Sequence, residues 1–209
     1  MSLKIKVCGM KYPANIKALA ELEPDYMGFI FYPPSQRFIG VEFEKQDVSD
    51  LQPQIQRTAV FVNAHLHEVI EFANLYGMKT IQLHGQESPE FCGELKAKGF
   101  KVIKAFGINE SFNFDTLTAY EEQVDFFLFD TKTNQHGGSG LTFDWQILQN
   151  YMLNKPFLLS GGLSPDNLTE VLKIKHQSFY GVDLNSKFEI EPALKDIEKL
   201  EKAFELIRG

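Results

Sequence analysis

The chain has 209 residues, and its contents of 44% hydrophobic and 23% charged residues are those of an ordinary globular protein. A formal net charge of −7 argues against a general nucleic-acid-binding protein, because neutralising phosphates requires a basic surface. No apolar run approaches the ~20 residues that span a bilayer, and MSLKIKVCGM lacks the apolar core of a secretion signal, so we expect no membrane partner.

Eight short segments rich in Val, Ile, Phe and Tyr predict β-strands. In chain order they are Lys4–Cys8, Tyr26–Tyr32, Thr58–Asn63, Thr80–His84, Lys101–Phe106, Asp125–Thr131, Pro156–Ser160 and Phe179–Asn185. Helical periodicity or N-terminal Ser-Pro signals appear between or after them. The clearest helical segments are Pro13–Leu22, His65–Tyr76, Pro89–Lys98, Pro165–Ile174 and Pro192–Ile207, whereas the segments after the second, fifth and sixth strands are less clear.

Strands that alternate with about eight helices predict an α/β fold with parallel strands and crossover helices. Eight such units close naturally into a (β/α)8 (TIM) barrel, and we expect residues 1–209 to form one such domain. A doubly wound open sheet is the alternative, but no G-x-G-x-x-G motif opens a first helix.

Polar residues interrupt these apolar strands on alternating positions. In a barrel we expect the mixed face to point inward, with its polar members near the carboxyl ends of the strands, where barrel active sites lie. The alternative is a structural plug of paired Lys and Asp, since buried charges must be paired. The polar residues concerned are Lys4, Lys6, Cys8, Gln82, His84, Lys104, Asp130 and Asp183.

Two segments after the last two strands suggest an anion site. Gly161 and Gly162 follow the seventh strand, where glycine lets backbone N–H groups approach a phosphate and the next helix offers a positive end. Asn185 and Ser186 follow the eighth strand, and a phosphate site between these two loops recurs in TIM barrels. A simple tight turn is the alternative for Gly161-Gly162. A third glycine-rich stretch, His136–Gly140, suggests a mobile loop or a flexible connection.

The chain has two cysteines, Cys8 and Cys92, which form neither a disulfide framework nor a zinc-ligand spacing. We therefore expect reduced thiols, no metal site and a cytoplasmic protein. Cys92 falls in the helix predicted over Pro89–Lys98 and is interpreted as a packing residue.

Six motifs, in order along nearly the whole chain, resemble the phosphoribosylanthranilate isomerases of tryptophan biosynthesis. They are Lys6-Val7-Cys8-Gly9, Phe61-Val62-Asn63, Gln82-Leu83-His84-Gly85, Asp130 followed by GGSG, Ser160-Gly161-Gly162-Leu163 and Gly181-Val182-Asp183. The resemblance implies a cofactor-free (β/α)8 barrel. Its activity would convert N-(5-phosphoribosyl)anthranilate to 1-(2-carboxyphenylamino)-1-deoxyribulose 5-phosphate, which is an Amadori rearrangement.

The resemblance also implies residue roles. Cys8 corresponds to the general base, Asp130 to the general acid, and Arg37 to the arginine that holds the anthranilate carboxylate. His84 and Asp183 are candidate substrate-binding residues. The phosphate would bind the backbone of Gly161, Gly162, Asn185 and Ser186; relatives often have glycine where this chain has Lys187.

The chemistry sets conditions on the acid and the base. Asp130 must carry a proton, which burial at the barrel mouth favours. Cys8 must be a thiolate, although a free thiol with a pKa near ~8.5 is mostly protonated at neutral pH. Lys6, on the same strand face, is the candidate for lowering that pKa. The partner would be a small phosphosugar–anthranilate substrate, and the protein a monomer or homodimer.

Three rival functions remain open at the level of sequence. A histidine-pathway Amadori isomerase on the same fold would use two aspartates, where the first strand here offers Cys8. A non-catalytic phosphosugar-binding barrel would keep the glycine loops without needing Cys8 and Asp130. A purely structural barrel would not require these polar residues to coincide.

Overall fold

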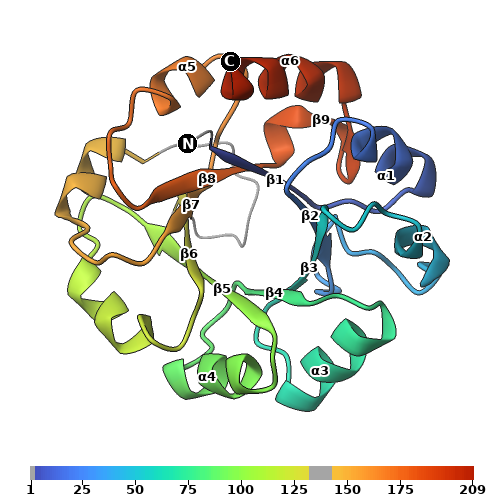
Figure 1. Cartoon of the computed structure of the whole chain (residues 1–209), viewed down its shortest axis with the longest axis horizontal. Coiled ribbons are helices and arrows are strands. Elements are labelled where there is room, and N and C mark those ends of the chain that lie inside the picture. Colours follow the sequence, from blue (N-terminus) through green and yellow to red (C-terminus); the bar gives the residue numbers. More distant parts are fainter. Residues whose placement is uncertain (1–2, 132–142) are drawn as a thin grey trace.

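A closed barrel of eight parallel strands forms the centre of the computed structural model, which describes residues 3–131 and 143–209. Each strand pairs with the next in chain order, and β1 pairs with β8 (Figure 1). The strands are β1 Lys4–Cys8, β2 Tyr26–Ile30, β3 Gln56–Phe61, β4 Thr80–Leu83, β5 Lys101–Ile108, β6 Phe126–Thr131, β7 Phe157–Leu159 and β8 Phe179–Leu184. The predicted (β/α)8 fold is confirmed.

Helical segments surround the barrel (Figure 1). The α-helices are α1 Pro13–Ala20, α2 Gln46–Ser49, α3 Leu66–Leu75, α4 Pro89–Ala97, α5 Leu168–Val171 and α6 Ile197–Arg208. Short 3-10 helices follow β5, β6 and β8, at η1 Phe114–Tyr120, η2 Trp145–Asn150 and η3 Ser186–Phe188. The last helix, α6, packs between α5 and α1 and so completes the outer layer beside the first unit. No helix among the described residues is long and apolar enough to cross a membrane.

Two predicted helices differ from the observed ones. The helix predicted over Pro165–Ile174 is reduced to α5, which begins only at Leu168. The helix predicted from Pro192 begins at Ile197, because Asp196 caps it by accepting a hydrogen bond from the Lys199 N–H. The residues before it form a small antiparallel hairpin of β9 (Glu189–Glu191) and β10 (Leu194–Lys195).

Register determines which side chains face the barrel interior. Lys6 of β1 is the register partner of Tyr26 on β2 and of Asp183 on β8, so these three share the inner face. An apolar cluster fills the interior at the β5–β7 side; its buried members are Ile103, Ala105, Leu128 and Leu158. The larger core lies between the strands and the helices.

Lys104 corrects the expectation that every polar strand residue points inward. Its register partners are Leu83 and Phe127, which belong to the core outside the barrel, whereas Ile103 and Ala105 of the same strand face the interior. Lys104 Nζ lies 3.2 Å from the carboxylate of Glu87, and both side chains are buried. It is therefore a structural ion pair behind the sheet, and the mixed-face pattern is reversed on β5.

Candidate active site

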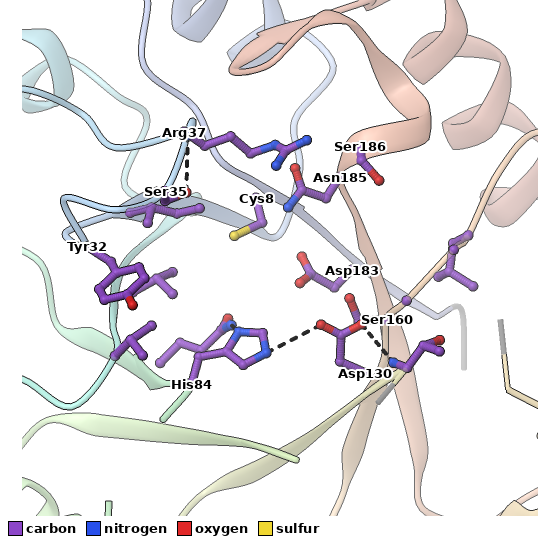
Figure 2. A pocket seen from close by; sticks show the side chains of 18 residues that line it. Cys8, Tyr32, Ser35, Arg37, His84, Asp130, Ser160, Asp183, Asn185 and Ser186 are labelled. Carbon is purple, nitrogen blue, oxygen red and sulfur yellow. Dashed lines mark hydrogen bonds and ion pairs between the residues drawn. The ribbon is translucent and has the colours of Figure 1, made fainter. Parts of the chain in front are cut away.

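One cavity lies at the carboxyl ends of the strands and collects all nine site residues expected from the sequence (Figure 2). They are Cys8, Arg37, His84, Asp130, Gly161, Gly162, Asp183, Asn185 and Ser186. Other lining residues were not singled out as site residues, including Tyr32, Ser35, Thr131 and Ser160. The structure thus brings the nine together, while the role of each stays a prediction.

Cys8 ends β1 and is nearly covered, with 3% of its surface exposed. Burial raises the pKa of its thiol, while the charge of Lys6 and a hydrogen bond from it act in the opposite direction without cancelling the rise. Lys6 is fully buried and donates to the Asp183 carboxylate over 2.9 Å. Lys6 is therefore shared between two groups: it donates a hydrogen bond to the carboxyl group of Asp183, and its charge favours the thiolate form of Cys8.

The space beside the thiol is provided by Gly28, the register partner of Cys8 on β2. A Cβ atom at Gly28 would lie 2.8 Å from Cys8 Sγ and 3.2 Å from Lys6 Nζ. Because the first distance is shorter than real side chains tolerate, any larger residue would displace the thiol.

Asp130 lies near the end of β6, and its side chain is 14% exposed. Its Oδ1 accepts a hydrogen bond from the Thr131 N–H over 2.8 Å, and its Oδ2 lies 3.3 Å from His84 Nε2 (Figure 2). The other ring nitrogen, Nδ1, lies 3.2 Å from Nε2 of Gln82. The Gln82 side chain therefore holds one side of the His84 ring, and the other side of the ring faces Asp130, the candidate general acid.

The turn after β7 brings backbone close to Asp130. Gly161 has a φ of +83°, and a Cβ there would clash with the backbone N and hydroxyl of Thr131 and lie 2.6 Å from Asp130 Oδ1. Gly162 also has a positive φ, of +67°. The next helix, α5, begins only at Leu168, and Asn167 closes the loop before it, since its side chain accepts from the Ser164 N–H and donates to the Gly162 carbonyl.

Arg37 lines the cavity and is held by a residue that sequence reasoning missed. The Glu189 carboxylate accepts from Arg37 Nη2 over 2.6 Å and from Nε over 2.9 Å. Glu189 also pairs with buried Lys195 over 2.6 Å, and Lys195 donates to Asn185 Oδ1 over 2.7 Å. No sequence signal marked either residue as part of the site: Glu189 lay outside the predicted elements, and Lys195 lay in the helix predicted over Pro192–Ile207, which the structure begins only at Ile197.

Three further expectations concern residues at the edge of the site. Lys187 is exposed on η3 and is absent from the lining of the cavity. The glycine-rich stretch His136–Gly140 lies outside the described residues. Within residues 3–131 and 143–209, no group of three or more His, Cys, Asp or Glu side chains is arranged to hold a metal ion.

Fold and site together define a class: a TIM-barrel enzyme whose cavity at the strand ends brings a thiol and a carboxyl group beside the Gly161–Gly162 turn, an arrangement suited to acid–base chemistry on a small molecule. Residues 5–206 match the family model described as N-(5'phosphoribosyl)anthranilate (PRA) isomerase. The chain is 46% identical over 206 residues to the N-(5'-phosphoribosyl)anthranilate isomerase of Parabacteroides distasonis, covering 97% of this chain and 92% of that protein. The chain belongs to the phosphoribosylanthranilate isomerase family.

Solved structures agree with this membership. The phosphoribosyl anthranilate isomerase of Thermotoga maritima is 32% identical, with a TM-score of 0.86, and the match covers 99% of this chain and 98% of that one. A second isomerase, in complex with reduced 1-(o-carboxyphenylamino)-1-deoxyribulose 5-phosphate, is 28% identical with a TM-score of 0.83 and 97% coverage of both chains. Another Thermotoga maritima structure, 27% identical with a TM-score of 0.79 and coverage of 99% and 98%, is described as monomers of a dimeric enzyme.

Proposed function

We propose that this cavity carries out the isomerisation of N-(5'-phosphoribosyl)anthranilate, the activity of its family in tryptophan biosynthesis, with Cys8 as general base and Asp130 as general acid. The supporting observation is that a thiol and a carboxyl group line the same cavity as the Gly161–Gly162 turn and the Asn185–Ser186 segment. The product would be 1-(2-carboxyphenylamino)-1-deoxyribulose 5-phosphate.

The first step opens the furanose ring. Protonated Asp130 gives its proton to the ring oxygen as the bond between that oxygen and C1 breaks, and the anilino nitrogen supplies the electron pair that forms a protonated imine. His84, facing Oδ2, orients the carboxyl group for this transfer. Asp130 is left as a carboxylate in contact with solvent, from which it regains its proton.

The second step moves a proton from carbon. The Cys8 thiolate removes the C2 proton, the electrons of that C–H bond form a C1–C2 double bond, and the electron pair of the C1–N double bond returns to the nitrogen, which gives a neutral enolamine. The enolamine becomes the ketone by gaining a proton at C1 and losing the proton of the C2 hydroxyl, and the Cys8 thiol returns its proton to solvent. Lys6 compensates the thiolate charge before the proton is taken. One acidic and one basic group in one cavity thus divide the two proton transfers between them.

The two ends of the substrate are both anionic. We assign the anthranilate carboxylate to Arg37, whose planar fork suits a carboxylate. The phosphate is assigned to the backbone of Gly161, Gly162, Asn185 and Ser186, and the sugar between them to the neighbourhood of Asp183. Each assignment is supported by the position of these residues around one cavity.

Turnover by purified protein tests the proposal. We expect Cys8→Ala and Asp130→Asn each to reduce kcat by at least about 10²-fold, since positioned proton transfer contributes about 10² to 10⁴. Binding of the reduced product analogue should persist in both variants. Cys92→Ala, which changes the other thiol, is the matched control and should keep its activity. Lack of turnover by the unmodified protein, or full activity in Cys8→Ala, would contradict the proposal.

We further propose that residues 1–209 act as one domain in the cytoplasm on a small-molecule substrate, without nucleic-acid or membrane partners. Closure of the barrel by β1 and β8, with α6 against α1, supports a single unit. The free thiols of Cys8 and Cys92 support a reducing compartment. The protein would be a monomer or homodimer, as in the dimeric relative.

A further inference from the structure

Glu189 is the centre of a buried charge network beside the cavity. Its Oε1 accepts from Arg37 Nε (2.9 Å), Lys195 Nζ (2.6 Å) and the Ala193 N–H (3.1 Å), and its Oε2 accepts from Arg37 Nη2 (2.6 Å). The exposed fractions of the side chains are 4% for Glu189, 13% for Arg37 and 0% for Lys195. These bonds are charge-assisted and shielded from solvent, so they hold their partners more firmly than surface pairs do.

The network contacts two neighbouring residues of the proposed substrate site, one assigned to the carboxylate and one to the phosphate. Glu189 occupies the Nε–Nη2 edge of Arg37, and a guanidinium has a second edge that can bind another carboxylate. Lys195 donates to the side chain of Asn185, which belongs to the phosphate side. Figure 2 shows Arg37 and Asn185 next to one another above Cys8.

Hydrogen bonds and close packing anchor this network to the segment that follows β1. Lys195 is tied to α1 through both backbone groups, since its N–H donates to Asn15 Oδ1 over 2.8 Å and its carbonyl accepts from Asn15 Nδ2 over 2.9 Å. Gly9, in the turn after β1, lies next to both site residues, since a Cβ atom there would be 2.7 Å from Arg37 Cδ and 3.1 Å from Asn185 Oδ1. Arg37 and Asn185 are therefore packed against the same turn after β1.

The charges of the network favour an anionic ligand. Arg37 and Lys195 are cations and Glu189 is the anion between them, which leaves one net positive charge beside the cavity. Burial lowers the pKa of Lys195 to about 8, with Glu189 opposing that shift. Burial would raise the pKa of Glu189, but its bonds to Arg37 and Lys195 outweigh this, so that pKa lies below the usual range. Glu189 is thus held as a carboxylate.

We propose that Glu189 and Lys195 are positioning residues that keep Arg37 and Asn185 in a fixed mutual geometry, so that one network aligns the carboxylate end and the phosphate end of the substrate. The inference rests on the proposed function, because Arg37 and Asn185 are substrate contacts only there. Neither Glu189 nor Lys195 touches the reacting atoms in this assignment. Their effect is on alignment, and misplacement by about 1 Å can cost about 10²-fold in rate.

Glu189→Gln tests the proposal, with Glu191→Gln on the exposed side of the same hairpin as the matched control. We expect Glu189→Gln to raise KM for phosphoribosylanthranilate by about 10- to 100-fold and to lower kcat less, since Arg37 and Asn185 bind rather than react. Affinity for two separate probes, anthranilate and ribose 5-phosphate, should fall together. Arg37→Met should weaken only the binding of anthranilate. Asn185→Ala keeps the backbone groups assigned to the phosphate but loses the hydrogen bond from Lys195, and it should weaken only the binding of ribose 5-phosphate.

A double variant that lacks both buried charges distinguishes a loss of positioning from a loss of stability. Glu189→Gln alone leaves the Lys195 charge buried without its anion, whereas Glu189→Gln/Lys195→Met removes both charges. The double variant should recover the Tm but keep the raised KM. Recovery of KM along with Tm, or a Glu189→Gln variant that behaves like Glu191→Gln, would overturn the positioning role. Absence of turnover in the unmodified protein would instead reject the proposed function itself.

Discussion

At the scale of single residues, the base candidate is a thiol in a buried, charge-balanced place. Cys8 has an ammonium group beside it, yet that ammonium already serves Asp183 over 2.9 Å. The effect of burial on the thiol is larger than that of the Lys6 charge, so the pKa of Cys8 stays above its usual range. The reactive thiolate of Cys8 is therefore scarce at neutral pH and becomes more abundant as pH rises.

Lys6 should control this titration. We expect kcat/KM to rise with pH into the alkaline range, and Lys6→Gln to move that rise to still higher pH, because the charge that favours the thiolate is lost. The pH dependence of the alkylation rate of Cys8 measures the thiol directly. It is best done in a Cys92→Ala background, although burial already raises the pKa of Cys92 to about 12. The double variant Lys6→Met/Asp183→Asn removes both charges, and it controls for the effect of leaving the buried Asp183 carboxyl group without its cation. An unchanged thiol titration in Lys6→Gln would contradict the role of Lys6.

Gly28 should be needed for the position of the thiol. In Gly28→Ala the new Cβ would meet Sγ at 2.8 Å, so we expect the thiol to turn away and kcat to fall by about 10²-fold. Overpacking should also cost about 1–3 kcal/mol of unfolding free energy. Gly99→Ala is the control, because nothing lies within 4 Å of its Cβ while its φ of +86° still costs stability. Equal activity in the two variants would show that the space beside Gly28 is dispensable.

At the scale of elements, the turn after β7 and the end of β6 act as one piece. Gly161 packs directly on Thr131 and Asp130, so the segment assigned to the phosphate also shapes the surroundings of the acid. The loop from this turn to α5 is short, and Asn167 closes it through side-chain hydrogen bonds to Ser164 and Gly162. Phosphate binding and acid placement should therefore change together.

Gly161→Ala tests this coupling. The substitution adds a Cβ that would lie 2.6 Å from Asp130 Oδ1, at a backbone φ of +83° that L-residues rarely adopt. We expect a fall in kcat together with weaker inhibition by inorganic phosphate, while the alkylation rate of Cys8 on the opposite side stays unchanged. Gly77→Ala, with a similar positive φ and no contact closer than 3.9 Å, is the control for backbone strain. Loss of phosphate inhibition with normal kcat would separate the two effects.

At the scale of the whole molecule, charged groups are buried on both sides of the sheet. Lys6 and Asp183 pair inside the barrel, whereas Lys104 and Glu87 pair between the strands and the helices. Lys104 also donates to the carbonyls of Gly85 and Ala105, and Glu87 accepts from the N–H of Gly85. The outer pair therefore holds the β4 end, which carries His84, to β5.

Breaking the outer pair should destabilise the barrel. Glu87→Gln leaves the buried ammonium of Lys104 without its anion, and we expect a loss of about 3–5 kcal/mol in the unfolding free energy. Glu170→Gln, in a pair whose side chains are 62% and 65% exposed, should cost only about 0–1 kcal/mol. Urea unfolding measures both. If the two variants unfold alike, the buried pair contributes no more than a surface pair.

The sequence by itself determined the eight strands, their order and the barrel, because apolar β-branched and aromatic runs bounded by Gly, Pro and Asn are local signals. Together with the family resemblance, which supplied Arg37, it also placed nine candidate residues at strand ends or in the loops that follow them, and these meet in one cavity because parallel strands all end at the same face. Tertiary structure alone decided which way Lys104 points, that Glu189 and Lys195 brace Arg37 and Asn185, and that Gly28 makes room for Cys8. These depend on register and on contacts between segments distant in sequence, such as Lys6 with Asp183, for which a linear pattern carries no signal.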